Sequence, residues 1–406
     1  MLNDFKGSLG NSQSDNINTT TSTTNNNAIA NYSFAKEIQD LANKLNHSKI
    51  PDGLRTKCKS MLIRLAKMVN VNNITAEYES VSEYINWIIK IPWGSYTEEN
   101  INIENVKQEL DRHHYGLEPV KTRILEHLAI IKLTEYGISG SQHFKEQTNQ
   151  KSFEEMSKLQ GSSSHAPVMC FIGIQGVGKT SMAKSIANAL NRKFIRIALG
   201  GLGTVNEIRG VPRSVVGAEP GQIIKALVRT GSMNPLILLD EIDKVSIQTG
   251  ARADVMAALL EILDPEQNSS FVDKYLDYPV DLSKCMFITT ANNSGGISAA
   301  LLDRLEIIRF GSYTDQDKIM IAKNYLLPKV REATGLQSEH LDFEEDVWPL
   351  VIRPLGFDAG VRQLERTLYE LARKVALQIV QGTTKGVKIT KDNFRQFIPE
   401  DIGIYS

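Results

Sequence analysis

The residues that could carry chemistry begin with a glycine-rich loop that ends in a lysine and a threonine. Gly173-Ile-Gln-Gly-Val-Gly-Lys179-Thr180 has the spacing of a phosphate-binding loop, and an apolar run precedes it. Glycines let backbone N–H groups turn towards phosphate oxygens, and the start of the following helix adds donors and a favourable dipole. We therefore expect Lys179 to reach the β- and γ-phosphates of a nucleotide and Thr180 to place its hydroxyl on Mg²⁺. The predicted phosphate-binding residues are Gly173, Ile174, Gln175, Gly176, Val177, Gly178, Lys179, Thr180 and Ser181.

Two later apolar runs end in polar side chains that suit hydrolysis. One run is followed by Asp240 and Glu241, and a second by Asn292. Carboxylates at the carboxyl end of a buried strand lie where open α/β sheets bind ligands. We expect Asp240 to hold Mg²⁺ partly through water and Glu241 to orient and deprotonate the attacking water. Asn292 would touch the γ-phosphate or align the same water.

Two arginines also suit phosphoryl chemistry. Arg304 lies in Leu301-Leu-Asp-Arg-Leu-Glu, and Arg362 lies in Ala359-Gly-Val-Arg-Gln-Leu-Glu. A guanidinium group stabilises the negative charge that develops on a transferring phosphoryl group. Spacing alone favours a surface ion pair for each arginine. The adjacent histidines at 113 and 114 do not converge on one point, so we do not predict a metal site there.

The elements that must position these residues alternate between strands and helices. From Val168 to Phe310, short apolar runs alternate with helical patterns, which is typical of an α/β fold: a parallel sheet with helices on both faces. Residues 314–381 show helical spacing only and predict a small helical domain. The predicted strands are 168–172, 194–199, 236–239, 286–290 and 307–310, the predicted helices include 181–190, 222–230 and 252–263, and the later breaks are Pro328, Gly335, Pro354 and Gly356.

The N-terminal region has a different composition. Of the 21 residues from Asn11 to Asn31, 15 are Asn, Ser or Thr, which bury too little apolar surface to offset the entropy of ordering. We therefore predict a disordered tail over residues 1–33. Amphipathic helices begin at Phe34 and form a helical segment over 34–100. The polar stretch 139–165 is expected to be an exposed insertion before the first strand.

Composition excludes several classes of protein. The chain has 406 residues, is 41% hydrophobic and 23% charged, and has a net charge of −1. It can bury globular cores, and no overall field favours nucleic acid or an acidic membrane. Three widely spaced cysteines fit neither a disulfide framework nor a zinc site. No apolar run is long enough to span a membrane, and no secretory signal follows Met1, so we expect the cytoplasm.

Taken together, these residues resemble AAA+ ATPases, and several stretches are similar to those of Lon proteases in particular. The resemblance covers about residues 49–399. The stretches are His114-Tyr-Gly-Leu-Glu-Pro-Val-Lys, Glu207-Ile-Arg-Gly, Gly217-Ala-Glu-Pro-Gly, Leu260-Glu-Ile-Leu-Asp-Pro-Glu-Gln-Asn, Leu282-Ser and Ala359-Gly-Val-Arg-Gln-Leu-Glu-Arg. The resemblance implies an AAA+ nucleotide-binding domain over 101–311 and a small helical lid over 312–406.

The same resemblance implies roles for single residues. Tyr115 and Gly116 would lie by the adenine, Asn292 would be the first sensor and Arg362 the second sensor in the lid. Arg304 would be the finger that reaches a neighbouring subunit's ATP. The family implies a hexameric ring that binds ATP with Mg²⁺ between its subunits and threads protein substrates through its pore.

Three positions depart from the family pattern. The chain ends at Ser406, so we expect no C-terminal serine–lysine protease domain and no intrinsic peptidase activity. Val215-Val216 stands where the family's pore loop usually carries an aromatic–aliphatic pair, and a valine offers less area for gripping a chain. Gly176 replaces a more usual proline in the phosphate loop, which raises backbone freedom and keeps the donors.

Four functions fit the sequence. The preferred one is a stand-alone Lon-like motor that unfolds or remodels proteins, and the second is the ATPase half of a protease whose proteolytic part is a separate subunit. A nucleic-acid motor is a third class, against which the near-neutral charge and the lack of a recognisable DNA-binding module weigh. An ATP-binding scaffold without turnover is the fourth, and Glu241 and Arg304 argue against it.

Overall fold

The structure is a computed structural model that describes residues 23–68, 75–136, 167–245, 251–353 and 360–398. The predicted insertion at 139–165 and the predicted tail up to residue 22 lie outside the described residues. The chain divides into two compact units, Met1–Lys90 and Ile91–Ser406. None of the helices within the described ranges combines the length and the apolar composition needed to cross a membrane.

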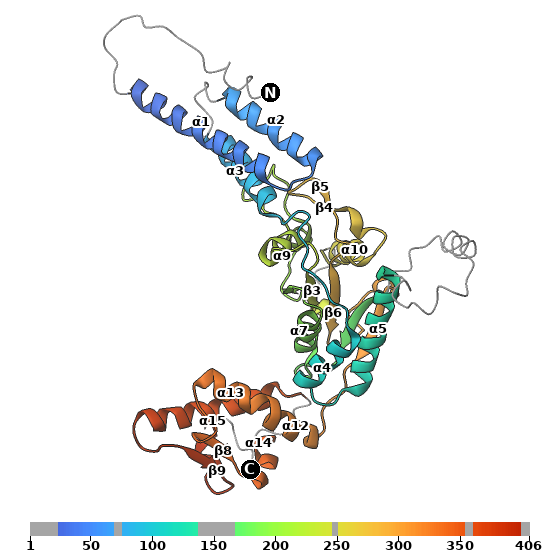
Figure 1. Ribbon diagram of the computed structural model, residues 1–406, viewed down its shortest axis with the longest axis vertical. Coiled ribbons are helices and arrows are strands. Elements are labelled where there is room, and N and C mark those ends of the chain that lie inside the picture. Colours follow the sequence, from blue (N-terminus) through green and yellow to red (C-terminus); the bar gives the residue numbers. More distant parts are fainter. Residues whose placement is uncertain (1–22, 69–74, 137–166, 246–250, 354–359, 399–406) are drawn as a thin grey trace, which may run out of the picture. The chain divides into compact units, whose positions relative to one another are not determined.

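Within its described residues, the first unit consists of three helices that pack on one another (Figure 1). They are α1 (Thr23–His47), α2 (Asp52–Met68) and α3 (Thr75–Lys90). The predicted apolar stripes form its core, with Leu45, Leu54 and Ile88 wholly buried. The expected boundary at residue 33 is wrong, because α1 begins at Thr23 inside the polar segment. Asn, Ser and Thr have weak helix propensity, and they do not prevent a helix from extending upstream of a packed stripe.

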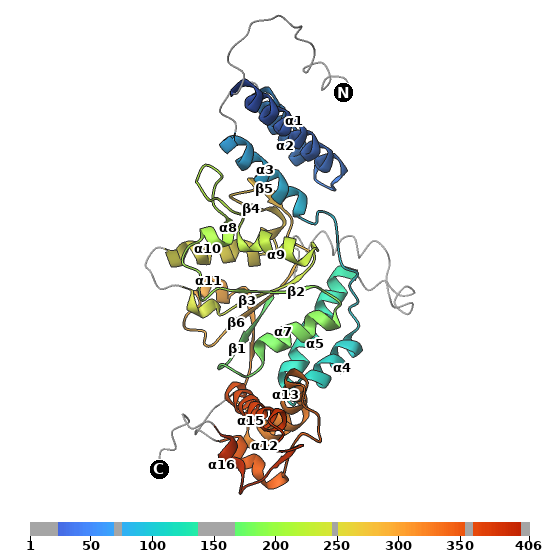
Figure 2. The same cartoon turned by 90° about the vertical axis from the view of Figure 1, so that its left-hand side faces the viewer.

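A five-stranded parallel sheet forms the centre of the second unit, with the strand order β2-β3-β6-β1-β7. Helices cover both faces of the sheet, as the sequence predicts, with α7 and α5 on one face and α9 and α10 on the other (Figure 2). The strands are β1 (Val168–Ile172), β2 (Phe194–Ala198), β3 (Leu236–Asp240), β6 (Met286–Ala291) and β7 (Leu305–Arg309). The helices are α4 (Ile103–His113), α5 (Glu118–Tyr136), α7 (Lys179–Ala189), α8 (Asn206–Arg209), α9 (Gln222–Thr230), α10 (Ala251–Leu263) and α11 (Ala299–Leu302).

The strand order brings the predicted site segments together. The glycine-rich loop follows β1, the two carboxylates follow β3 and Asn292 follows β6. Because β3, β6 and β1 are neighbours and parallel, their carboxyl ends meet at the same edge of the sheet. An antiparallel hairpin that the sequence did not indicate, β4 (Phe271–Asp273) and β5 (Tyr278–Val280), lies between α10 and β6.

The C-terminal part of the second unit is a small domain with its own core around Trp348, which stacks on Phe343 at 4.8 Å between ring centroids. The predicted small helical domain is confirmed, and the structure adds a short pair of parallel strands that the sequence did not indicate, β8 (Leu341–Phe343) and β9 (Val387–Ile389). Pro328 does not interrupt the helical path: it is the second residue of α13, directly after a π-helical turn. The helices are α12 (Asp315–Ile321), a π-helical turn η5 (Ala322–Leu326), α13 (Leu327–Thr334), α14 (Trp348–Val351), α15 (Arg362–Val380) and α16 (Phe394–Phe397).

Candidate active site

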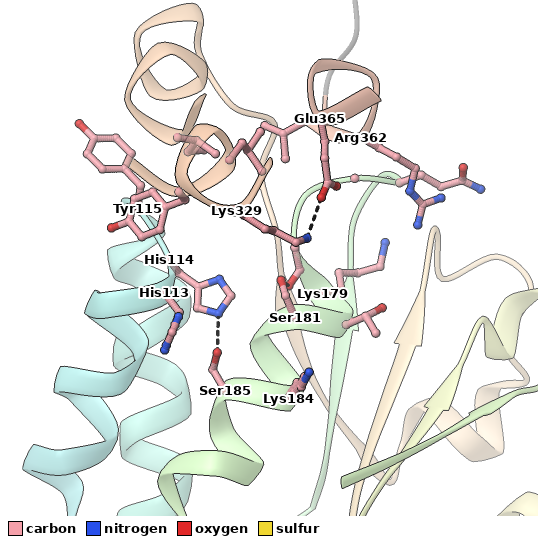
Figure 3. Close-up of a pocket in the computed structure, with 18 of the residues that line it drawn as sticks. His113, His114, Tyr115, Lys179, Ser181, Lys184, Ser185, Lys329, Arg362 and Glu365 are labelled. Carbon is pink, nitrogen blue, oxygen red and sulfur yellow. Dashed lines mark hydrogen bonds and ion pairs between the residues drawn. The ribbon is translucent and has the colours of Figure 1, made fainter. Parts of the chain in front are cut away.

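A cavity of about 750 Å³ opens between the carboxyl ends of the strands and the small C-terminal domain (Figure 3). Most of the predicted site residues line it, although they come from five separate segments of the chain. They are Tyr115, Gln175, Gly176, Gly178, Lys179, Thr180, Ser181, Asp240, Glu241, Asn292 and Arg362. The predicted residues that do not line it are Gly116, Gly173, Ile174, Val177 and Arg304.

The glycine-rich loop has the backbone that phosphate binding requires. Gly176 and Gly178 have φ angles of 84° and 93°, which glycine adopts without strain. Gly178 is the N-cap of α7 and offers no side-chain cap, so the first N–H groups of that helix lack a side-chain acceptor. The loop therefore presents backbone donors and a positive helix end to the cavity.

Lys179 is held at the centre of this loop. Its Nζ donates to the carbonyl oxygen of Gly173 at 2.5 Å, to that of Ile174 at 3.0 Å and to Asn292 Oδ1 at 3.3 Å. Burial lowers the pKa of Lys179, and the nearby carboxylates of Asp240, Asp243 and Glu241 act in the opposite direction. These contacts join the loop after β1 to the loop after β6 and place a cation between them.

At the end of β3, one hydroxyl contacts both predicted acidic residues, the carboxylate of Asp240 and the backbone of Glu241. Thr290 on β6 donates its Oγ1–H to Asp240 Oδ1 and accepts the N–H of Glu241 at 3.0 Å. Glu241 has a φ of 60°, a conformation that non-glycine residues rarely adopt. Its Oε1 pairs with Lys244 Nζ at 2.8 Å, and Asp240 Oδ2 accepts from Arg196 Nε at 2.5 Å.

The oxygen ligands at this edge fit Mg²⁺. Thr180 and Asp240 both line the cavity, and Mg²⁺ typically takes one or two protein oxygens and completes its shell with water and phosphate. No group of three metal-ligating His, Cys, Asp or Glu side chains gathers within the described ranges. Asp243 holds the Asn292 N–H through Oδ2 at 3.0 Å, and its buried Oδ1 has no hydrogen-bond partner among the described residues.

Opposite the strands, a tight turn after α4 forms the wall of the cavity. His114 caps α4, and the turn that follows has two left-handed residues, Gly116 and Leu117, with φ of 62° and 58°. His114 points at α7 and its Nε2 lies 3.0 Å from Ser185 Oγ (Figure 3). Burial lowers the pKa of His114 to about 4, assisted by the charges of His113 and Lys121. The imidazole is therefore neutral at pH 7, and Tyr115 follows it into the cavity.

The small domain closes onto the glycine-rich loop. The N–H of Val361 donates to the carbonyl oxygen of Gly176 at 3.1 Å, and Tyr313 Oη donates to that of Val177 at 2.9 Å. Arg362 follows directly and points into the cavity on the same side as Lys179 (Figure 3). Lys329 Nζ and Glu365 Oε1, both from this domain, form an ion pair of 2.6 Å at the same wall.

Arg304 lies elsewhere, at the start of β7. Its Nη2 pairs with Asp264 Oδ2 at 3.1 Å, and its side chain is 42% exposed. Asp264 belongs to the Leu260-Glu-Ile-Leu-Asp-Pro-Glu-Gln-Asn stretch, and its other contacts to Glu266 N and Gln267 Nε2 fix its orientation. The structure therefore does not bring Arg304 into the cavity of its own chain.

Several residues of this site escaped sequence reasoning. Arg196, Thr290, Asp243 and Lys244 touch the predicted carboxylates or Asn292 through the contacts above. Thr290 lies inside a run that signals only a buried strand, and Arg196 gives no signal until the pairing of β2 with β3 is known. His114 lies in a stretch that the sequence singled out, although its burial against α7 could not be inferred.

Comparisons with known proteins agree with this geometry. Residues 169–313 match the ATPase family associated with various cellular activities (AAA), and residues 332–388 match the Lon protease AAA+ ATPase lid domain. The chain is 41% identical over 363 residues to Lon protease 2 of Thermus thermophilus, which covers 89% of this chain and 43% of the relative. It is 40% identical over 369 residues to Lon protease 1 of Bacillus subtilis, covering 91% of this chain and 44% of the relative.

A third relative, the Lon protease of Dictyoglomus thermophilum, is 42% identical over 355 residues, 87% of this chain and 41% of that protein. The chain thus spans less than half the length of these relatives. The shared region contains the glycine-rich loop, the carboxylates after β3 and the small domain that contacts the loop. This chain therefore carries an AAA+ ATPase module of the Lon type, with its nucleotide-binding domain and its lid.

Proposed function

We propose that the cavity binds ATP with Mg²⁺ and hydrolyses its γ-phosphate bond. The observation that carries this proposal is the meeting of Lys179, Thr180, Asp240, Glu241 and Arg362 around one cavity. Each side chain has the charge or the oxygen that phosphoryl transfer to water requires at that position. The turn at Tyr115 and Gly116 would receive the adenine at the opposite wall.

The residues divide the work of hydrolysis. The loop N–H groups and Lys179 bind the phosphates, while Thr180 and Asp240 hold Mg²⁺, which supplies positive charge against phosphate oxygens when bound. Glu241 accepts the proton of the attacking water. Asn292 keeps Lys179 in place by accepting a hydrogen bond from its Nζ. Arg362 adds positive charge from the lid, so opening or closing of the lid changes the site.

We further propose that this module is a motor that acts on protein chains as a homo-oligomeric ring, with six subunits. Arg304 lines no part of its own cavity and is partly exposed, which suits a finger that completes a neighbour's site. Val216 is fully exposed and Val215 is 52% exposed, which suits a loop that grips a substrate chain. The three cysteines, Cys58, Cys170 and Cys285, are buried and widely spaced in the sequence, which fits a reducing compartment such as the cytoplasm.

The names of the relatives favour a second candidate. All three are called proteases, so the module would supply the ATP-driven step of a protease whose peptide cleavage occurs outside the residues compared. Cleavage of an unfolded protein that appears only after a second polypeptide is added would support this candidate. Unfolding without any cleavage supports the stand-alone motor.

The glutamate at the end of β3 gives the sharpest test of hydrolysis. Glu241→Gln keeps the shape of the side chain and removes its basicity, so ATP should still bind while turnover falls by about a hundredfold or more. Glu266→Gln is the matched control, because Glu266 is exposed and lines no part of the cavity. Phosphate release and nucleotide titration measure the two effects, and turnover near the wild-type rate in Glu241→Gln would assign the base to another residue.

A further inference from the structure

The loop that carries Val215 and Val216 is anchored by an unusual buried group. It runs from Gly210 to Gly221, between α8 and α9, next to the β4–β5 hairpin (Figure 2). Its tip is exposed, whereas its base is closed by a hydrogen bond from Val211 N–H to the carbonyl oxygen of Glu219 at 3.0 Å. Something at the base must resist any force that a substrate applies at the tip.

Asp273, the last residue of β4, occupies that place. Its side chain is wholly buried, and Oδ2 accepts the N–H of Gly221 at 2.7 Å. Oδ1 accepts the N–H groups of Tyr275 and Leu276 at 2.8 and 3.1 Å, in the turn of the hairpin. A single carboxylate therefore joins the C-terminal end of the exposed loop to the hairpin.

The N-terminal end of the loop lies against the same carboxylate. A Cβ at Gly210 would lie 2.7 Å from Asp273 Oδ1, and the φ of Gly210 is 79°, so this position requires glycine. The N–H of Lys274, next to Asp273, donates to the carbonyl oxygen of Arg209 at 2.6 Å. Both ends of the loop therefore contact the Asp273 side chain or the backbone of the next residue, Lys274.

Burial of this group is expensive unless its hydrogen bonds are made. Desolvation raises the pKa of Asp273 to about 6, although three backbone N–H groups and the Lys225 ammonium favour the charged form. A carboxylate in such surroundings is strongly destabilised when an N–H partner leaves. The loop end at Gly221 is therefore held more firmly than an ordinary surface turn.

We infer that Asp273 is the positioning residue of the 211–220 loop: it clamps both ends of the loop to the β4–β5 hairpin so that the Val215-Val216 tip can transmit force to the sheet. The inference deepens the proposed motor function and rests on it, because the tip is assigned to substrate only there. It gives the hairpin, which takes no part in the cavity, a role in substrate handling.

The test uses Asp273→Asn in the full chain. An asparagine retains one oxygen for the turn at Tyr275 and Leu276, and its NH₂ faces the Gly221 N–H, which loses its acceptor. Hydrogen exchange at the amides of Gly221 and Val211 should become about tenfold faster or more. ATP hydrolysis without protein substrate should stay near the wild-type rate, while unfolding of a protein substrate per ATP falls about tenfold. Asp281→Asn is the control, because Asp281 is exposed and accepts the Ser283 N–H within its own turn.

The outcomes separate this inference from the function beneath it. Wild-type exchange at Gly221 and Val211 in Asp273→Asn would overturn the clamp, whatever the activities are. Faster exchange with wild-type unfolding per ATP would overturn its mechanical role. A wild-type chain that hydrolyses ATP but unfolds nothing would refute the motor, and the exchange result would still decide the clamp.

A second measurement covers the case in which Asp273→Asn does not fold. In the wild-type chain, the clamp predicts that the Gly221 amide exchanges at least a hundredfold more slowly than the amide of exposed Val216. Similar exchange at the two amides would contradict the clamp. Gly210→Ala, which forces a Cβ onto the carboxylate from the other end of the loop, should speed exchange at Gly221 with Asp273 intact.

Discussion

At the residue scale, the site contains residues whose backbone conformation or burial is unfavourable by itself and is stabilised by a neighbouring side chain. Glu241 adopts a left-handed backbone, and His114 is a buried neutral imidazole. Each is fixed by a neighbour, since Thr290 accepts the Glu241 N–H and Ser185 faces His114. Such unfavourable conformations persist where the surrounding contacts fix them, and they are common at functional sites.

The buried His114 makes stability depend on pH. Its pKa is about 4 in the folded chain and 6.5 as a free side chain, so between these values only the unfolded chain takes up the proton. The stability that the neutral His114 allows is therefore fully present above pH 6.5 and is lost as the pH falls from 6.5 towards 4. When the pH falls from 7 to 5, proton uptake by His114 in the unfolded chain should lower the free energy of unfolding by about 2 kcal/mol.

His114→Gln cannot titrate and should lack this part of the pH dependence in denaturant unfolding at pH 7 and pH 5. His47→Gln, at an exposed histidine of the first unit, should keep the wild-type dependence. Equal pH dependence in wild type and His114→Gln would mean that His114 takes up its proton as easily in the folded chain.

How much of the site the sequence predicts depends on the kind of contact. The glycine-rich loop, Asp240, Glu241 and Asn292 were predictable, because each follows a strand and the strands are recognisable from their apolar runs. Arg196 and Thr290 were not, because their contacts arise between strands that lie far apart in the sequence. Arg362 was proposed from the resemblance, and its place at the cavity depends on how the lid packs.

At the scale of elements, the connection between the lid and the glycine-rich loop matters most. The Val361–Gly176 hydrogen bond is possible because Gly360 has no side chain: a Cβ there would lie 2.5 Å from the Gln175 carbonyl oxygen. The lid therefore contacts the glycine-rich loop through its backbone, and it also places Arg362 at the cavity. This arrangement suits a lid whose position follows the nucleotide.

Gly360→Ala should push the lid off the loop and weaken ATP binding by about tenfold, the cost of roughly one hydrogen bond. Gly311→Ala is the matched control, because a Cβ at Gly311 meets nothing within 4 Å. Titration with a fluorescent ATP analogue measures affinity, and circular dichroism checks that both variants fold. Wild-type affinity in a folded Gly360→Ala chain would show that loop and lid bind independently.

The length of an element decides whether its sequence pattern can be recognised. The five strands of the sheet are five or six residues long, and β1, β3 and β6 are almost wholly buried, so their apolar runs are visible. The strands β4, β5, β8 and β9 have three residues each, too few to show alternation. Helix α1 extends upstream of its apolar stripe, where composition alone indicated disorder.

At the scale of the whole molecule, the role proposed for Arg304 would need an adjacent subunit. Arg304 is held by Asp264 outside its own cavity, so its proposed role can be performed only for an adjacent subunit. Head-to-tail contacts form a ring when the rotation between successive subunits closes. A chain that hydrolyses ATP as an isolated monomer would leave Arg304 without that role.

Mixing two inactive variants tests this arrangement. Arg304→Ala should lower turnover by about a thousandfold with ATP still bound, and Lys179→Ala should abolish binding. Mixed rings form some sites that combine an intact Lys179 with an intact neighbouring Arg304, about a quarter of them at equal mixing. Phosphate release should therefore recover in the mixture, whereas no recovery in confirmed mixed rings would place the action of Arg304 within its own subunit.

The central claim, that this chain is an ATP-driven motor for protein chains, is tested most directly by following the structure of a loosely folded, tagged fluorescent substrate. The wild-type chain with ATP and Mg²⁺ should abolish its fluorescence, and neither Glu241→Gln with ATP nor the wild type without hydrolysable nucleotide should do so. A wild-type chain that hydrolyses ATP steadily while the substrate keeps its fluorescence at every concentration would contradict the account.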